Sequence, residues 1–147
     1  MSELHDLVKK HIAEKNATDY GTEMHKKLQY VFFDSVAPRG DKQLCEQISK
    51  NPELCKYMSL DSQTEVPIAG WINDEFVSRR IDRLYVNDKE KKVVVVDYKT
   101  DTDRQTLRDK YKKQLGEYKK LLEQVYPEYN ISCKILWISD FSLENII

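Results

Sequence analysis

The sequence predicts an α/β protein, with a mixed sheet of about four strands, helices on its flanks and extra helices at the N-terminus. Three observations predict this class. Apolar residues recur at helical spacing before about Gln63 and alternate as in strands after it, and a long amphipathic segment precedes the last predicted strand. A meander followed by a crossover helix and another strand gives a sheet that is antiparallel in one part and parallel in another.

The N-terminal part is predicted to form four helices. The first ends before a break at residues 16–20, and the second begins after Gly21 with Thr22 as its N-cap. Two short helices follow, separated by Asn51 and Pro52. The apolar face predicted for the first helix consists of Leu4, Leu7, Val8, His11 and Ile12.

The remaining part contains the predicted strands. They cover residues 64–72, 76–86, 91–99 and 131–141, with a helix at 105–125 before the last strand. Turn residues between the first three strands favour an antiparallel meander, and the strand after the helix is predicted to run parallel to a neighbour. Val93 to Val96 are four consecutive β-branched apolar residues, which predicts a strand buried on both faces.

Length and composition indicate one ordered domain over residues 1–147. An apolar content of 40%, a charged content of 33% and a net charge of -1 exclude a disordered chain and a strongly basic or acidic one. No targeting pattern or membrane-length apolar stretch is present, so we expect a cytoplasmic protein without membrane contact. Cys45, Cys55 and Cys133 lack the spacing of a metal motif and are predicted to be small buried side chains.

An acid and an amine follow the buried valine strand. Asp97 and Lys99 project from the same face, and Asp82 lies on the strand predicted to pair with theirs. Two close carboxylates repel each other unless a cation lies between them, which indicates a divalent metal such as Mg²⁺. The alternative is a solvated turn or surface ion pair, with Asp82 paired to Arg80 or Arg83.

Three other polar residues can be placed beside this strand end. His25 flanks the apolar stripe of its predicted helix, so its ring can point into a cleft, although a helical histidine is more often a surface residue. Gln114 and Tyr118 are one turn apart on the long helix and face the same direction.

Taken in order, five motifs resemble those of the RecB-type nuclease family, which belongs to the PD-(D/E)xK nuclease superfamily. They are GTEMH (21–25), TEVPI (64–68), RRIDRL (79–84), VVDYKT (95–100) and QLGEY (114–118). The resemblance spans about residues 21 to 138 and implies a PD-(D/E)xK nuclease-like core.

The resemblance also implies roles for single residues. The implied ligands of Mg²⁺ or Mn²⁺ are His25, Asp82, Asp97 and the backbone carbonyl of Tyr98. Asp82 and Asp97 would act in catalysis with Lys99, which would orient the attacking water and stabilise developing charge. Gln114 and Tyr118 would line the nucleic-acid groove. Glu65 matches an acidic position of the family, and its role is open between contacts to metal, water and arginine.

The implied function is metal-dependent hydrolysis of DNA phosphodiesters, as an exonuclease with little sequence preference in DNA repair or recombination. The expected substrates are single strands or free ends. Some members of the family carry an iron-sulfur cluster held by cysteines. The cysteines of this chain do not match that pattern, so no iron-sulfur cluster is expected. The alternative is a nuclease-fold module that binds DNA or acts as a scaffold in a helicase complex, with weak or no cleavage.

The resemblance also implies a helicase partner, since the chain itself has no motor that could unwind DNA. None of its glycines opens a phosphate-binding loop of the GxxxxGK[ST] type. The resemblance favours the branch found at the C-terminal end of UvrD-like helicases, so such a helicase would act in cis or in trans. Whether the chain is a whole gene product or part of a longer helicase-nuclease is open.

The long helix has a local excess of positive charge. Its segment 104–120 contains many more basic than acidic residues, although the whole chain is nearly neutral. One interpretation is a solvated helix face. Because the resemblance places this helix in the groove, Lys110, Lys113 and Lys119 are predicted to contact phosphates and to supply salt-sensitive affinity for DNA.

Overall fold

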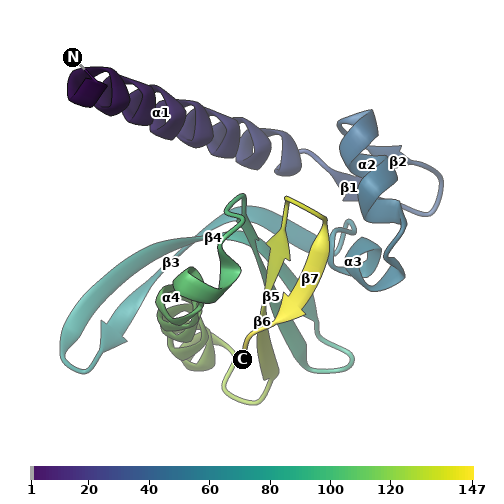
Figure 1. The fold of residues 1–147 in the computed structure, drawn as a ribbon. Coiled ribbons are helices and arrows are strands. Elements are labelled where there is room, and N and C mark those ends of the chain that lie inside the picture. Colours follow the sequence, from purple (N-terminus) through teal and green to yellow (C-terminus); the bar gives the residue numbers. More distant parts are fainter. Residues whose placement is uncertain (1) are drawn as a thin grey trace.

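The computed structural model describes residues 2–147, and Figure 1 shows the arrangement of the elements. The helices are α1 (Ser2–Leu28), α2 (Lys42–Ser49), α3 (Pro52–Tyr57) and α4 (Arg104–Val125). The main sheet consists of β3 (Ser62–Ile72), β4 (Glu75–Asn87), β5 (Lys92–Lys99), β6 (Asn130–Trp137) and β7 (Ser142–Asn145). A small ribbon of β1 (Phe32–Phe33) and β2 (Pro38–Arg39) lies between α1 and α2. The protein therefore belongs to the α/β class.

The main sheet is mixed, with the strand order β3-β4-β5-β6-β7. Strands β5 and β6 are parallel and are connected through α4, whereas the other neighbours are antiparallel. The predicted meander and the predicted parallel strand are confirmed. The predicted number of about four strands is wrong, because the chain turns at Asp140 and Phe141 and returns as the short edge strand β7.

Both faces of the sheet are covered. Val93 to Val96 are fully buried, as predicted. Val94 and Val96 pack in a cluster with apolar residues of α1, α2 and α3, while Val93 and Val95 pack with residues of α4. Strand alternation thus sends successive valines into two separate cores, and the sheet forms the middle layer between them.

Helix α1 is one continuous helix, so the predicted break at residues 16–20 is wrong. This segment contains no proline, and its polar residues each disfavour a helix by only a few tenths of a kcal/mol. Thr18 donates its hydroxyl hydrogen to the carbonyl of Glu14 within the helix. Gly21 allows a close approach, because an added Cβ would lie 3.2 Å from Oγ1 of Thr100.

The first part of α1 has no buried face. The apolar residues predicted to form one, Leu4, Leu7, Val8 and Ile12, are all exposed, and His11 is exposed as well. Figure 1 shows this part of the helix extending away from the sheet. Burial begins with Met24 and Leu28, so only the C-terminal end of α1 is anchored to the core.

The cysteines behave largely as predicted. All three are free thiols, with Cys45 and Cys133 buried and Cys55 half-buried. None of the helices that the structure describes combines the length and apolar composition needed to cross a bilayer.

Candidate functional site

Three acidic residues lie in one row across the first three strands of the sheet. The register pairs Thr64 with Arg83 and Arg83 with Val96. Continuing it by one residue places Glu65 opposite Asp82 and Asp82 opposite Asp97. Glu65 has a φ of 53°, a conformation that a non-glycine residue adopts only under local constraint, so β3 is kinked at this row.

Asp97 is the most deeply buried of the three acids, with a side-chain exposure of 3%. Nζ of Lys99 lies 3.0 Å from its Oδ2 atom and forms an ion pair with it. Burial and the neighbouring charge of Asp82 raise the pKa of Asp97 to about 7. The ammonium group of Lys99 thus only partly compensates the buried carboxylate.

His25 connects α1 to the same row. Its Nδ1 atom lies 2.9 Å from the carbonyl oxygen of Gly21, and its Nε2 atom lies 3.3 Å from Oδ2 of Asp82. A carbonyl can only accept a hydrogen bond, so Nδ1 carries a proton and Nε2 is the atom free to bind a cation or a second proton. The hydrogen bond with Asp82 raises the pKa of His25 to about 9.

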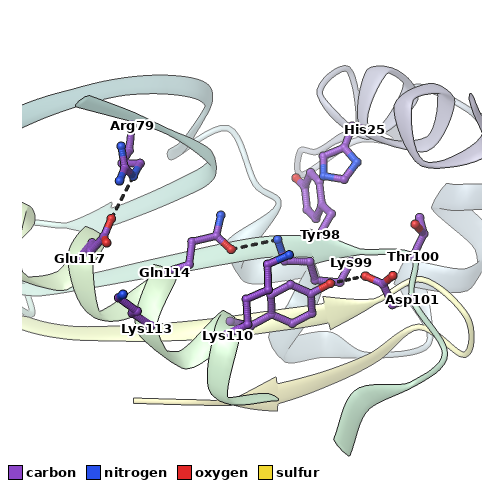
Figure 2. A pocket seen from close by; sticks show the side chains of 11 residues that line it. His25, Arg79, Tyr98, Lys99, Thr100, Asp101, Lys110, Lys113, Gln114 and Glu117 are labelled. Carbon is purple, nitrogen blue, oxygen red and sulfur yellow. Dashed lines mark hydrogen bonds and ion pairs between the residues drawn. The ribbon is translucent and has the colours of Figure 1, made fainter. Parts of the chain in front are cut away.

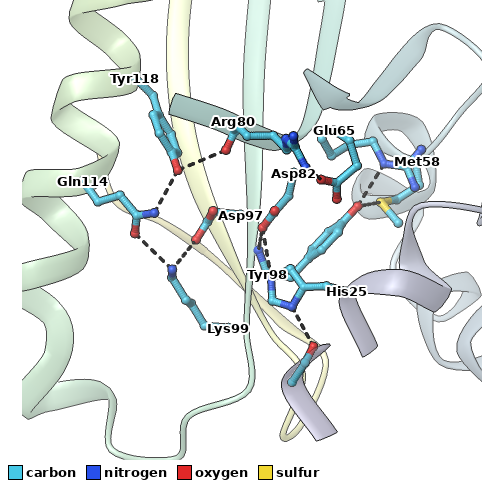
Figure 3. Close-up of polar contacts among 12 residues, drawn as sticks. His25, Met58, Glu65, Arg80, Asp82, Asp97, Tyr98, Lys99, Gln114 and Tyr118 are labelled. Atoms are coloured by element: carbon cyan, nitrogen blue, oxygen red, sulfur yellow. Dashed lines mark hydrogen bonds and ion pairs between the residues drawn. The ribbon is translucent and has the colours of Figure 1, made fainter. Parts of the chain in front are cut away.

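Asp82 is held between two strands and the histidine (Figure 3). Its Oδ2 atom accepts a hydrogen bond of 2.9 Å from the backbone N–H of Tyr98. Burial raises the pKa of Asp82, but the hydrogen bond and the charge of His25 outweigh this, and the pKa is lowered. Neither Arg80 nor Arg83 pairs with Asp82, so the alternative of an ion pair between Asp82 and one of these arginines is wrong.

The backbone of Tyr98 passes directly through the site, while its side chain is anchored in the opposite core. The ring lies edge-on to His25, with centroids 5.7 Å apart, and its hydroxyl accepts a hydrogen bond of 3.0 Å from Arg83. Arg83 is fully buried and also donates to the carbonyls of Leu28 and Val31. Arg83 therefore ties the end of α1 to the strand that carries the site.

Helix α4 supplies the opposite wall through a chain of hydrogen bonds. Lys99 donates to Oε1 of Gln114 at 3.0 Å, and Gln114 donates to the hydroxyl of Tyr118 at 2.8 Å. Tyr118 donates in turn to the backbone carbonyl of Arg80 at 3.3 Å. The predicted pair on α4 thus meets Lys99, and Gln114 fixes the position of the ammonium group (Figure 3).

A cleft of about 610 Å³ opens over this arrangement, between α1, the end of β5 and α4 (Figure 2). Its lining includes His25, Lys99, Gln114, Lys110 and Lys113. A second cleft of about 730 Å³ adjoins it along α1 and shares His25. Lysines 110 and 113 therefore lie where a substrate could reach them.

Five of the predicted residues do not line either cleft: Glu65, Asp82, Asp97, Tyr118 and Lys119. Lys119 lines neither of these clefts and lies near Cys133, where its charge lowers the pKa of the thiol against the larger effect of burial. Glu65 pairs loosely with Arg80, whose Nη1 atom lies 3.7 Å from Oε2 of Glu65. The sequence left three contacts open for Glu65, to metal, to water or to arginine, and the structure contains the contact to arginine.

Several residues of the cleft were not identified from the sequence. Arg79 pairs with Glu117 at 2.9 Å and joins β4 to α4 at the rim. Tyr111 donates a hydrogen bond to Asp101, and its ring lies 4.3 Å from Nζ of Lys99. The charged residues in the middle of β4 were the available signal for Arg79, whereas nothing in the sequence distinguishes Tyr111 from its buried neighbours.

The donor chemistry of the site fits a hard or borderline divalent cation. Mg²⁺ takes one or two carboxylates and keeps several waters, and an imidazole suits Mn²⁺. Nε2 of His25 and Oδ2 of Asp82 already face one point, and Oδ2 of Asp97 is a further carboxylate oxygen, in contact with Lys99. Among residues 2–147, however, no three His, Cys, Asp or Glu side chains are close enough to form a metal-binding group as they stand.

No protein-family model matches the chain, and no curated protein matches it.

Proposed function

We propose that this chain is a metal-dependent deoxyribonuclease of the RecB type in the PD-(D/E)xK superfamily. In this proposal, the protein shortens DNA from free ends, with little sequence preference, during DNA repair or recombination. The observation that carries the proposal is the buried carboxylate of Asp97, which lies beside the Asp82–His25 pair and whose pKa is raised to about 7 although Nζ of Lys99 is only 3.0 Å away. A buried carboxylate whose pKa stays raised beside a second carboxylate is typical of a site that binds a cation.

Two features support the choice of a phosphodiester as substrate. The cleft is lined by Lys99, Lys110 and Lys113, so a bound phosphate would lie beside Lys99, which contacts the buried Asp97. Lys99 is positioned by Gln114 and by the ring of Tyr111, and its ammonium group points into the same cleft. Such a fixed cation can orient a water molecule and stabilise charge that develops on a phosphoryl oxygen.

Hydrogen bonds to the backbone hold two of the proposed metal ligands in place. His25 is oriented by the carbonyl of Gly21, and Asp82 by the N–H of Tyr98. Together with Asp97 and the backbone carbonyl of Tyr98, they would hold Mg²⁺ or Mn²⁺. When bound, the ion would lower the pKa of water and neutralise charge on the phosphate.

The proposal is tested by digestion of end-labelled DNA in Mg²⁺ or Mn²⁺. Linear single strands should shorten progressively from an end, and covalently closed single-stranded circles should stay intact. Blunt duplex should react more slowly, since the chain contains no nucleotide-binding loop of the kind that drives unwinding. Absence of hydrolysis with either metal on every substrate would contradict the proposal.

One observation favours the second candidate, a nuclease-fold module that binds DNA or acts as a scaffold for a UvrD-like helicase. As they stand, the described side chains form no group of three metal ligands, and Lys99 already contacts Asp97. A titration with Mg²⁺ and Mn²⁺ discriminates between the two. A rise in melting temperature favours the enzyme, because a ligand that binds the native state stabilises it, whereas an unchanged melting temperature favours the module.

A further inference from the structure

The β3–β4 hairpin exposes a pair of aromatic side chains near its tip. Trp71 and Phe76 are 63% and 57% exposed, although they are cross-strand partners in the sheet. Their rings meet edge-on, with centroids 5.5 Å apart. Cross-strand aromatic contact stabilises a hairpin, but here the outer surfaces of both rings remain in water.

These rings point away from α4. Gly70 faces the helix, since an added Cβ would lie 3.0 Å from the side chain of Leu121, and Arg79 faces it through Glu117. Trp71 adjoins Gly70 and Phe76 lies three residues before Arg79, so by strand alternation both side chains project from the outer face. The exposed pairs that continue this outer face toward the site are Ala69 with Ser78 and Pro67 with Arg80.

The outer face leads to the acidic row. Arg80 has a 70% exposed side chain and only a loose ion pair with Glu65, the residue opposite Asp82. At about 3.3 Å per residue, the distance along β4 from Phe76 to Asp82 is about 20 Å. Figure 3 shows Arg80 and Glu65 beside Asp82, at the inner end of this path.

The chemistry of this path fits an unpaired nucleic-acid strand. Ala69 and Ser78 leave a flat floor, the guanidinium of Arg80 can pair with a phosphate, and the aromatic pair offers surfaces on which bases stack. The acidic residues at the hairpin tip do not lie along the path, and Glu65 is the acidic residue at its inner end. Asp74 is in the turn, and Glu75 pairs with Ile72 and lines a hollow toward α4.

A folded protein partner fits the same surface less well. Protein interfaces have an apolar core of several residues with complementary shape. The outer face of this hairpin offers two aromatic side chains followed by small and polar ones, which is too little for such a core. Stacking tolerates any base, which agrees with a nuclease that has little sequence preference.

We propose that the outer face of the β3–β4 hairpin is a track for single-stranded nucleic acid. Bases stack on Trp71 and Phe76, and Arg80 contacts the backbone on the way to the acidic row. This inference rests on the proposed function. It specifies the substrate as nucleic acid that is single-stranded where it leaves the acidic row along the hairpin. It also predicts that oligonucleotides long enough to reach the hairpin tip bind more tightly than short ones.

The test compares oligo(dT) of about 4 and about 20 nucleotides, with Ca²⁺ in place of Mg²⁺. For the unaltered protein, the long oligonucleotide should quench tryptophan fluorescence, because Trp71 is exposed while Trp137 is buried. The double variant Trp71→Ala/Phe76→Ala should lose on the order of 10-fold in affinity for the long oligonucleotide and little for the short one. Val125→Ala, which trims an exposed apolar residue at the end of α4, should change neither affinity.

The outcomes separate this inference from the proposed function. If the unaltered protein binds neither length, both the nuclease proposal and the track are wrong. If the unaltered protein binds both oligonucleotides without quenching, and the double variant binds them equally well, the track is wrong. Trp71 and Phe76 then only stabilise the hairpin or contact a protein, and the nuclease proposal stands. Quenching is measured on the unaltered protein, so it decides the question even if the double variant folds poorly.

Discussion

Nε2 of His25 lies 3.3 Å from Oδ2 of Asp82, so a helix and a strand present two potential ligand atoms to one point. The carbonyl of Gly21 keeps a proton on Nδ1. In the protein without a metal, a second proton on Nε2 satisfies the carboxylate, and the pKa of His25 rises to about 9. A divalent ion at this point has to displace that proton, which couples metal binding to pH.

The affinity for Mn²⁺ is therefore expected to increase with pH. Binding should displace a proton from His25, whose pKa is about 9, and below neutral pH another from Asp97, whose pKa is about 7. About two protons should be released near pH 6 and about one near pH 8. Calorimetry in buffers of different ionisation enthalpy measures this number. In His25→Gln the release near pH 8 should disappear, and an affinity independent of pH in the unaltered protein would contradict the prediction.

Asp97→Asn should abolish cleavage and stabilise the protein without metal. The native pKa of about 7 lies above the ordinary value of 3.8. Between these values the native state binds more protons, so the free energy of unfolding falls as pH rises, and the deficit is complete above about pH 7. Since one pKa unit corresponds to about 1.4 kcal/mol, the variant should gain up to a few kcal/mol at pH 8.

Urea unfolding of Asp97→Asn at pH 4 and pH 8, with chelator present, measures this effect. The difference from the unaltered protein should be small at pH 4 and largest at pH 8. A variant that digests DNA at the normal rate would show that Asp97 is not part of the reaction.

Lys99→Ala is expected to lose on the order of 10²-fold or more in rate, which is typical of a group that stabilises charge in the transition state. Metal binding should survive, because the proposed ligands remain. The measurement is a comparison of single-turnover cleavage with calorimetric Mn²⁺ affinity. Gln114→Ala serves as a companion variant, since it frees the Lys99 ammonium group without removing it, and should lose less rate. Loss of metal affinity together with rate would make Lys99 a structural residue.

The acidic row could be predicted because strand periodicity and pairing act locally. Asp82 and Asp97 lie on strands joined by a short turn, so the hairpin register brings them together. The contact to His25 depends on where α1 ends relative to the sheet. That position is set by Arg83, whose acceptors are the carbonyls of Leu28 and Val31, and backbone carbonyls leave no signal in the sequence.

The errors have physical causes as well. The break in α1 was predicted from polar residues whose helix propensities are only slightly unfavourable, and its apolar stripe was assumed to need a partner within the chain. The phosphate contact predicted for Lys119 is a different case, because the helix places this lysine apart from Lys110 and Lys113. At about 100° per residue, a helical wheel puts it on a different face, and the structure agrees.

Arg83→Met is expected to destabilise the protein by on the order of 3 kcal/mol, because several buried acceptors lose their donor. Urea unfolding measures this loss. Arg39→Met is the matched control, since Arg39 pairs with Asp34 at the surface and should change stability by less than about 1 kcal/mol. The pKa of His25, followed by NMR, should fall toward 6.5 in Arg83→Met as the end of α1 loosens. An unchanged pKa would show that Arg83 does not position the histidine.

The last prediction concerns the lysines on α4. Lys110 and Lys113 line the cleft, whereas Lys112 and Lys119 lie on the same helix outside it. Lys110→Glu/Lys113→Glu should weaken binding of single-stranded DNA and reduce the slope of log affinity against log salt by about 1.4, or about 0.7 for each lost phosphate contact. Lys112→Glu/Lys119→Glu changes the net charge equally and should leave the slope nearly unchanged. Titration across a salt series with Ca²⁺ measures both variants. Equal losses in the two would show that α4 attracts DNA only through its overall charge and that the cleft does not hold the phosphates.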